Sequence, residues 1–419
     1  MKKIFVLSAL FLCSVSIFAD KEAEKPTIGA KDISSNNIER GKFFIAVDGK
    51  GKECSKEKPC GLESLDLRKG FLRDRIKPND IIFFRGGRYY FSMDGVKRIY
   101  LKGGTKDKPV IYESYPNEVA IFDGSRISTD DTKSEVWREG KIHLREDYTI
   151  LRKVDIENMP QQGIRIFGNH NIIEGCRIHH NHLSGIDINS LKKESLDAGG
   201  SYNIIRNNYI YSNSDANINH HNYKDGDNAD GITVGKGTGN LISHNTVYSN
   251  SDDGIDTWKS INTVVEYNLV YDNGKGKRGN GNGIKLGGAP AGSPLGTGAI
   301  AKHNISYDNR YMGFNINSGK DVVMKYNTAY SNAGYGYTVA NDTVIIKNIS
   351  FKNTKGDIGW SKGKEQILNS WQLDKNLTTD SFESLDYSSD LFLVPVGNLK
   401  SIGAYAVEDD TNSNISIKK

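Results

Sequence analysis

The amino-acid sequence predicts an all-β protein that folds as a parallel β-helix, in which successive coils of one chain stack into a solenoid. Three observations support this fold class: a repeat of about 22 residues, short β-branched runs such as Thr263-Val264-Val265, and 44 glycines among 419 residues. Short apolar runs between turn residues indicate strands, and a repeat of this length indicates a coil made of several strands. A solenoid grows as one body, so the length does not require several domains.

The repeat consists of seven copies of the pattern apolar-x-x-Asn-x-x-aromatic-x-Asn. Its shortest steps are 21 and 23 residues, and the longer steps contain insertions. The first Asn column holds Cys176, Asn208, Asn245, Asn268, Asn304, Asn327 and Asn348, and the column five residues later holds Asn181, Asn213, Asn250, Asn273, Asn309, Asn332 and Asn353. We expect inward Asn side chains of stacked coils to form hydrogen-bonded ladders, since unpaired buried amides are costly. Cys176 in this column is expected to be a buried, unreactive thiol.

The N-terminal residues 1–19 have the pattern of a secretory signal peptide. Lys2 and Lys3 precede an apolar run that ends at the small residue Ala19. A lipoprotein signal centred on Cys13 is the alternative, and Leu12 disfavours it because a small residue is expected there. We therefore expect the mature chain to be exported, to the periplasm or the extracellular space.

The remaining chain, residues 20–419, is expected to form a single domain. Residues 20–80 are expected to include a cap with helical spacing over 62–73, which would protect the open end of the stack. The coils are expected over 81–353, and a loop-rich flank over 354–419. Export also permits a disulfide between Cys54 and Cys60, and the sequence leaves open whether these residues are bridged or free.

The charge and hydropathy of the chain exclude some classes of partner. The formal net charge is only +4, and the lysines are spread along the sequence instead of forming the dense basic block of a nucleic-acid arm. No segment after the leader is long and apolar enough to span a bilayer. We expect no nucleic-acid partner and no membrane span, and we expect a monomer.

The candidate catalytic and metal-binding residues lie in a Gly-apolar-x frame that recurs on successive coils. Once the insertions are removed, Asp230, Asp252, Asp253 and Asp256 fall on neighbouring rungs, and Lys285 lies one rung beyond Asp256. Neighbouring strands are about 4.8 Å apart, so these groups are expected to converge. Carboxylates this close repel one another, and a hard divalent cation such as Ca²⁺ would remove that conflict. The alternative is that these are solvated turn aspartates with Lys285 as an ion-pair partner.

These motifs resemble polysaccharide lyase family 9, which contains pectate lyases and rhamnogalacturonan lyases. The resemblance lies in Asp-Gly at 230–231, Ser-Asp-Asp-Gly-x-Asp at 251–256 and Asn-Gly-x-Lys-Leu-Gly-Gly at 282–288. It implies a right-handed parallel β-helix, calcium ligands at Asp230, Asp252, Asp253 and Asp256, and a catalytic base at Lys285. The implied reaction is β-elimination at a galacturonate of an acidic plant cell-wall polysaccharide, either polygalacturonate or rhamnogalacturonan I. The implied cofactor is Ca²⁺.

Basic and aromatic residues near this frame are candidates for substrate contacts. Lys259, Arg278 and Arg310 are candidate partners for uronate carboxylates, and ordinary solvated loop charge is the alternative. Trp258, Tyr311 and Tyr335 are candidates for stacking on sugar rings or, alternatively, for packing loops on the coil wall.

Two other functions fit part of the sequence. An inverting glycosidase of pectin would use two carboxyl groups about 6.5–9.5 Å apart, but it gives Lys285 no part. A non-catalytic, carbohydrate-binding β-helix adhesin would account for the repeat and the leader, but it leaves the acidic and basic column without a purpose.

Overall fold

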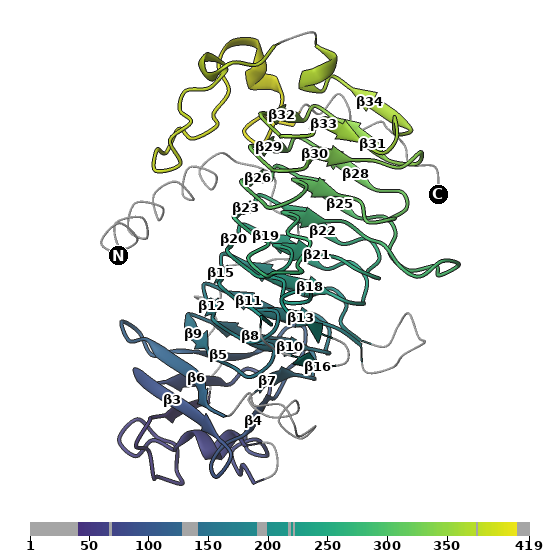
Figure 1. Cartoon of the computed structure of the whole chain (residues 1–419). Helices are drawn as coiled ribbons and strands as arrows, with labels where there is room; N and C mark the ends of the chain where they lie inside the picture. Colours follow the sequence, from purple (N-terminus) through teal and green to yellow (C-terminus); the bar gives the residue numbers. More distant parts are fainter. Residues whose placement is uncertain are drawn as a thin grey trace.

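The protein is a long parallel β-helix in the computed structural model, which describes residues 41–66, 69–127, 141–190, 199–216, 219–220, 223–373 and 376–408. Within these residues three long parallel sheets run the length of the molecule, and each coil contributes one strand to each sheet (Figure 1). The predicted fold class is confirmed. The expected signal peptide over residues 1–19 lies outside the described residues.

The first sheet has twelve strands and forms one wall of the solenoid. Its strands are β1 (Lys42–Ile45), β2 (Ile81–Phe84), β5 (Val110–Ser114), β8 (Thr149–Arg152), β11 (Ile172–Glu174), β14 (Ile204–Arg206), β19 (Leu241–Ser243), β22 (Val264–Glu266), β25 (Ile300–Lys302), β28 (Val323–Lys325), β31 (Val344–Ile346) and β34 (Glu365–Ile367).

The second sheet has ten strands and carries the candidate site described below. Its strands are β4 (Arg98–Leu101), β7 (Lys141–Leu144), β10 (Ile164–Ile166), β13 (Ile186–Ile188), β18 (Ile232–Val234), β21 (Ile255–Asp256), β24 (Ile284–Lys285), β27 (Phe314–Asn315), β30 (Tyr335–Thr338) and β33 (Gly356–Gly359).

The third sheet also has ten strands. They are β3 (Gly87–Ser92), β6 (Ala120–Arg126), β9 (Val154–Glu157), β12 (Arg177–His179), β15 (Tyr209–Tyr211), β20 (Thr246–Tyr248), β23 (Leu269–Tyr271), β26 (Ile305–Tyr307), β29 (Thr328–Tyr330) and β32 (Ile349–Phe351). A short antiparallel pair, β16 (Asn219–His220) and β17 (Tyr223–Lys224), lies in the insertion that precedes β18.

The core of the coils is made of aligned apolar columns. In the first sheet the middle residue of each three-residue strand points inward, as Ile205, Ile242 and Val265 do on successive coils, and all three are fully buried. In the second sheet the flanking residues point inward and the middle residue points outward, because successive side chains of a strand alternate between its faces. Ile232 and Val234 are therefore fully buried, while Thr233 between them reaches the outer face.

The predicted Asn ladders are present on both sides of the third sheet. The Asn245 amide, for example, donates to Asn268 Oδ1 at 3.0 Å, and Asn245 Oδ1 accepts from the Asn208 amide at 3.0 Å. Burial raises the pKa of Cys176 to about 12, in agreement with an unreactive thiol. A third ladder that the repeat pattern did not reveal joins Asn171, Asn203 and Asn240.

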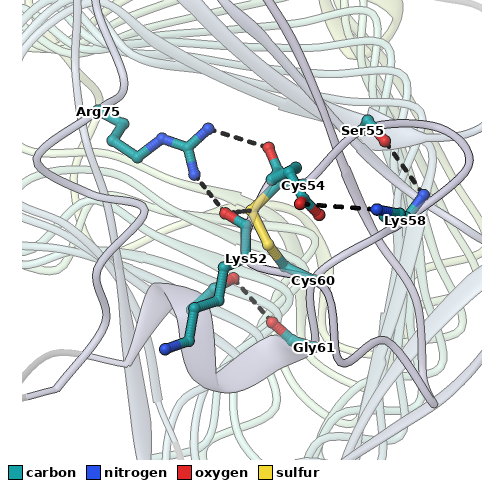
Figure 2. Close-up of a disulfide and its surroundings, with 9 residues drawn as sticks. Lys52, Cys54, Ser55, Lys58, Cys60, Gly61 and Arg75 are labelled. Atoms are coloured by element: carbon teal, nitrogen blue, oxygen red, sulfur yellow. Dashed lines mark hydrogen bonds and ion pairs between the residues drawn. A yellow bond between two sulfur atoms is a disulfide. The ribbon is translucent and has the colours of Figure 1, made fainter.

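The N-terminal end of the stack is closed by turns instead of the helix expected over residues 62–73. Among the described residues of this range, the structure has the 3-10 turn η1 (Leu62–Leu65). A 3-10 helix also brings residues three apart onto one side, so this turn accounts for the burial of Leu62 together with Leu65. Cys54 and Cys60 form a disulfide beside η1, and the Arg75 guanidinium donates to the carbonyl oxygens of Lys52 and Glu53, which directly precede Cys54 (Figure 2).

The stacked strands extend past the coil range that the repeat indicated. β1 precedes residue 81 and pairs with β2. At the other end, β33 and β34 continue their sheets beyond residue 353. After β34 the flank contains the 3-10 turns η3 (Ser370–Gln372), η4 (Thr379–Ser381) and η5 (Gly397–Ser401). Apolar flank residues, including Phe382, Phe392 and Leu393, pack on β26 and β32 of the third sheet. This leaves the outer face of the second sheet to the candidate site. No helix in the described part of the chain has the length and apolar character needed to cross a bilayer.

Candidate catalytic and metal site

The site forms on the outer face of the second sheet, where four neighbouring strands place polar residues in one column. Thr233 of β18 pairs with Asp256 of β21, and Asp256 pairs with Lys285 of β24. Lys285 in turn pairs with Asn315 of β27. The column predicted by removing the insertions from the repeat is therefore the column that the strands form.

Lys285 bridges two of the predicted aspartates. Its Nζ lies 3.0 Å from Asp253 Oδ2 and 3.0 Å from Asp256 Oδ2, and its side chain is only 12% exposed. Asp230, Asp253 and Asp256 each offer a carboxylate oxygen, and these three oxygens lie within 4.8 Å of one another. The structure thus joins three of the four predicted metal ligands with the predicted base in one buried cluster.

Asp252, the fourth predicted ligand, is buried beside this cluster but faces the neighbouring loop. Its Oδ1 accepts a hydrogen bond from the backbone N–H of Asn280. The charge of Asp252 is still felt in the cluster, because it helps to raise the pKa of Asp230. Asp252 lies one residue before Asp253 in the bend that leads into β21, and alternate residues of an extended chain point in different directions.

Each of the three clustered carboxylates is oriented by neighbouring donors. Thr233 Oγ1 donates to Asp230 Oδ2 at 2.7 Å, and the Asp253 backbone N–H donates to Asp230 Oδ1 at 3.1 Å. The Trp258 backbone N–H donates to Asp256 Oδ1 at 2.8 Å. Both oxygens of Asp230 thus accept a hydrogen bond, while Asp256 is fixed through Oδ1 and directs its Oδ2 toward Lys285 Nζ.

Asn282 is a further residue of the site to which the sequence pattern assigned no role. Its backbone N–H and its side-chain amide both donate to Asp253 Oδ1 at 2.7 Å. Its own Oδ1 accepts from Asn315 Nδ2 at 3.1 Å, and Thr338 Oγ1 donates to Asn315 Oδ1 at 3.2 Å. The signal was available, because Asn282 occupies the position before Gly that Asp230 and Asp253 occupy on earlier coils.

Burial and mutual repulsion raise the pKa values of Asp230, Asp252 and Asp256. Burial is the largest cause of the raised pKa of Asp230, and repulsion from the other aspartates adds to it. Burial likewise raises the pKa of Asp256, and the pKa of Asp252 rises to about 9 through burial and the charge of Asp253. Burial lowers the pKa of Lys285, but the attraction of the surrounding aspartates outweighs this effect and raises it well above its ordinary value.

The cluster fits a hard divalent cation. Its donors are carboxylate oxygens that converge within a few ångströms, and oxygen ligands of this kind suit Ca²⁺ in irregular coordination. The raised carboxylate pKa values point in the same direction, since they measure an excess of negative charge that a cation would offset. Asp230, Asp253 and Asp256 are the residues that could hold such an ion.

The whole chain can now be compared with known proteins. The family model described as the Pel9A-like, right-handed β-helix region matches residues 63–369 of the 419. The chain belongs to this family. The family resemblance seen in the motifs and the right-handed fold are both confirmed. No curated protein matches the sequence.

Solved structures share the fold of this Pel9A-like β-helix. The crystal structure of pectate lyase Pel9A is 24% identical with a TM-score of 0.69, and the match covers 91% of this chain and 94% of that chain. A rhamnogalacturonan lyase is 19% identical with a TM-score of 0.67, covering 87% and 100%. An alginate lyase from Paenibacillus sp. str. FPU-7 is 19% identical with a TM-score of 0.51, covering 70% and 95%. At these identities the likeness demonstrates a common fold.

The predicted substrate contacts differ in their surroundings within the Pel9A-like β-helix. Arg310 holds the loop before β24, because its guanidinium donates to the carbonyl oxygens of Gly274, Gly276 and Lys277. Lys259 Nζ lies 5.6 Å from the ring centre of Trp258, and both residues are partly exposed. Arg278 is exposed on the loop that Arg310 fixes. Arg310 is thus engaged with backbone, whereas Lys259 and Arg278 are accessible from the surface.

Two of the predicted sugar-stacking residues are in contact with other groups. Tyr335 packs against Gly359, where an added Cβ would lie 2.5 Å from the ring. The Tyr311 ring is covered on one side by Lys355, whose Nζ is 5.0 Å from the ring centre. These contacts favour the wall-packing alternative for Tyr335.

A second cluster of potential ligands lies on the third sheet and comprises Asp155, Glu157 and His179. Arg177 forms an ion pair with Asp155, and Arg88 forms one with Glu157. These arginines supply the positive charge that a metal ion would otherwise provide. The cluster therefore forms an ion-pair network that crosses the strands near the N-terminal end of the solenoid.

Proposed function

We propose that this protein is an exported, calcium-dependent polysaccharide lyase that cleaves a galacturonate-containing pectin backbone by β-elimination. The observation that carries the proposal is the position of Lys285 Nζ, 3.0 Å from both Asp253 and Asp256 in a buried cluster of carboxylates. Membership of the Pel9A-like family and the lyases among the structural neighbours support the same reaction class. Polygalacturonate and rhamnogalacturonan I both present a galacturonate at the cleaved bond, so both remain candidate substrates.

In the proposed reaction Lys285 acts as the general base. When bound, a divalent cation held by Asp230, Asp253 and Asp256 would offset their charge and polarise the uronate carboxylate, which makes the C5 proton more acidic. The pKa of Lys285 would fall once the attraction of the aspartates is offset, and in its neutral form Nζ accepts the C5 proton. The C4–O bond breaks and its electron pair leaves with the C4 oxygen, which takes up a proton from solvent to become a hydroxyl, while a C4=C5 double bond forms. The products are a 4,5-unsaturated uronate and a new chain end.

The surrounding residues have supporting roles in this proposal. Asn282 orients Asp253 through two hydrogen bonds, and Thr233 orients Asp230. Lys259 and Arg278 are proposed to contact uronate carboxylates, since both are accessible near the site. Arg310 is proposed to act indirectly, by fixing the loop that carries Arg278.

The spacing of the carboxylates disfavours the hydrolase alternative. An inverting glycosidase needs about 6.5–9.5 Å between its two carboxyl groups to accommodate a water molecule. The oxygens of Asp230, Asp253 and Asp256 lie within 4.8 Å of one another, and Lys285 occupies the position beside them. An elimination uses this lysine, whereas a hydrolysis gives it no role.

The test of the base assignment is a pair of substitutions at Lys285. Lys285→Ala removes the base, and Lys285→Arg retains the positive charge but cannot release a proton at working pH. We expect both variants to lose about 10²–10⁴-fold in the rate of unsaturated-product formation, the contribution of general-base catalysis. Calcium binding by calorimetry and the melting temperature serve as controls, and we expect calcium binding to be retained in Lys285→Ala. A rate for Lys285→Ala close to that of the wild type would contradict the assignment.

A further inference from the structure

Trp360 is a tryptophan on the surface of the solenoid, and its side chain is 60% exposed. Its φ angle is +79°, in the left-handed region, as at other bulky residues of the described turns such as Tyr202 and Leu368. The conformation is therefore part of the turn geometry of this fold, and the exposure of the indole ring is the feature that matters at Trp360. The residue lies beyond the recognisable repeat, which explains why the sequence pattern did not single it out.

Trp360 lies one residue beyond the end of the column that contains Lys285. Lys285 pairs with Asn315 of β27, Thr338 Oγ1 of β30 donates to Asn315, and Thr338 pairs with Gly359 of β33. Trp360 follows Gly359 directly. Three strand spacings separate β33 from β24, which corresponds to about 14 Å along the solenoid. A chain molecule laid along this face from Lys285 would therefore reach Trp360 within a few sugar units.

A hollow of about 510 Å³ opens beside Trp360, between the turns that follow β27, β30 and β33. Its polar lining includes Lys320, Asn341, Asp342 and Ser361. Ser361 Oγ hydrogen-bonds Asn341 Oδ1, and the Asp321 backbone N–H donates to Asp342 Oδ2 at 3.3 Å. Lys320 is exposed at the rim and provides the positive charge of the hollow. The lining combines an aromatic face, hydrogen-bonding groups and the opposite charges of Lys320 and Asp342, which together match a polar sugar ring whose carboxylate lies on the Lys320 side.

We propose that the hollow formed by Trp360, Lys320 and Asn341 is a distal subsite that binds a uronate residue of the same polysaccharide chain whose cleaved bond lies at Lys285. This inference rests on the proposed function and adds to it the length of substrate chain that the protein binds. The indole ring stacks on the sugar face, and Lys320 pairs with the carboxylate. The subsite lengthens the stretch of polymer that is held during cleavage, so the enzyme favours long chains over short oligomers.

The test compares Trp360→Ala with the wild type on polygalacturonate, using the initial rate of unsaturated-product formation. We expect the KM for the polymer to rise about three- to ten-fold in Trp360→Ala, the effect of losing one aromatic stacking contact. We expect kcat to change less than two-fold, because the ring is remote from the reacting atoms. Trp360→Phe is expected to restore most of the affinity, and Lys320→Ala is expected to raise KM on polygalacturonate.

The control is Tyr387→Ala, which removes an aromatic side chain that is 51% exposed on the C-terminal flank. Melting temperatures of all variants identify any loss of folding. We expect Tyr387→Ala to keep the KM of the wild type. If the KM of Trp360→Ala is equally unchanged, the subsite is overturned and the lyase assignment stays intact.

Retardation of the wild type and Trp360→Ala in a gel that contains polygalacturonate reports binding without turnover. Weaker retardation of Trp360→Ala supports the subsite even if no elimination is found, in which case only the proposed reaction fails. Equal retardation of the two proteins counts against the subsite.

Discussion

At the scale of single residues, the cluster around Lys285 places more negative charge in a buried volume than the chain can balance by itself. Asp230, Asp253 and Asp256 face one lysine, and Asp252 adds its charge from the side. Structural aspartates on a turn would be expected to face water, where ionisation costs little. The burial of these carboxylates, together with the donors that orient them, forms a cluster that could hold a cation.

This excess charge has a consequence for the pH dependence of calcium binding. Calcium would bind ionised carboxylates, so protons held by Asp230 and Asp256 must leave when it binds, and its charge would also favour ionisation of Asp252 beside the cluster. We expect the calcium affinity to fall as the pH is lowered from about 9 to about 6, with net release of protons. Calorimetry in buffers of different ionisation enthalpy measures the number released. An affinity independent of pH across this range, with no proton release, would contradict the description of the cluster.

The same pKa shifts determine whether the folded protein gains or loses stability as the pH rises. Because the pKa values of Asp230, Asp252 and Asp256 are raised in the folded chain, it holds protons that the unfolded chain has lost above about pH 4. The calcium-free protein should therefore become less stable as the pH rises from about 4 toward 9. Added calcium should raise the melting temperature, and it should do so most at the alkaline end of this range.

At the scale of structural elements, the Asn ladders hold the coils in register. The Asn245 side chain donates to Ile205 O at 2.9 Å and to Asn268 Oδ1 at 3.0 Å, and it accepts from both the backbone N–H and the amide of Asn208. Removing this one side chain leaves buried donors and acceptors on both neighbouring coils without partners. The ladder is therefore a structural necessity of the fold and not part of the catalytic apparatus.

Asn245→Ala is expected to lower the free energy of unfolding by about 1–3 kcal/mol, the cost of leaving a buried polar group unpaired. Chemical denaturation followed by circular dichroism measures the change. Asn398→Ala is the control, because Asn398 is exposed on the C-terminal flank and its loss should change stability by less than about 0.5 kcal/mol. Equal stabilities of the two variants would show that the ladder contributes nothing.

The sequence predicted best those elements in which every coil needs the same type of residue at the same position. The columns through Asn245 and Asn250 recur in each coil because the side chains bond to one another, and the column through Asp256 and Lys285 was found by the same count. The direction of the Asp252 side chain was not predictable, because it depends on a hydrogen bond from Asn280 in an insertion. Insertions follow no repeat, so their contacts appear only in three dimensions.

At the scale of the whole molecule, the ends of the solenoid were harder to predict than its middle. The N-terminal end is closed by turns and the Cys54–Cys60 disulfide, and the C-terminal flank packs on the third sheet. Trp360 belongs to the last coils, where the Gly-Ile frame has disappeared from the sequence although β33 still continues the second sheet. The strands persist there because the sheet edge provides backbone partners, which the side-chain pattern does not record.

The described part of the molecule therefore has one long face along the second sheet, with Lys285 on β24 and Trp360 just after β33 at the C-terminal end of that sheet. This arrangement suits a linear polysaccharide that is bound across several coils and cut at one of them. The flank covers a different sheet and leaves this face accessible.

The decisive measurement is the ultraviolet absorbance of unsaturated product when the wild-type protein is incubated with polygalacturonate and, separately, with rhamnogalacturonan I. We expect absorbance to rise on at least one polymer in calcium, to stop in excess chelator and to resume when calcium is restored. A hydrolase or a non-catalytic β-helix would generate no such absorbance. Cleavage without unsaturated product, or full activity in excess chelator, would contradict a calcium-dependent elimination at this site.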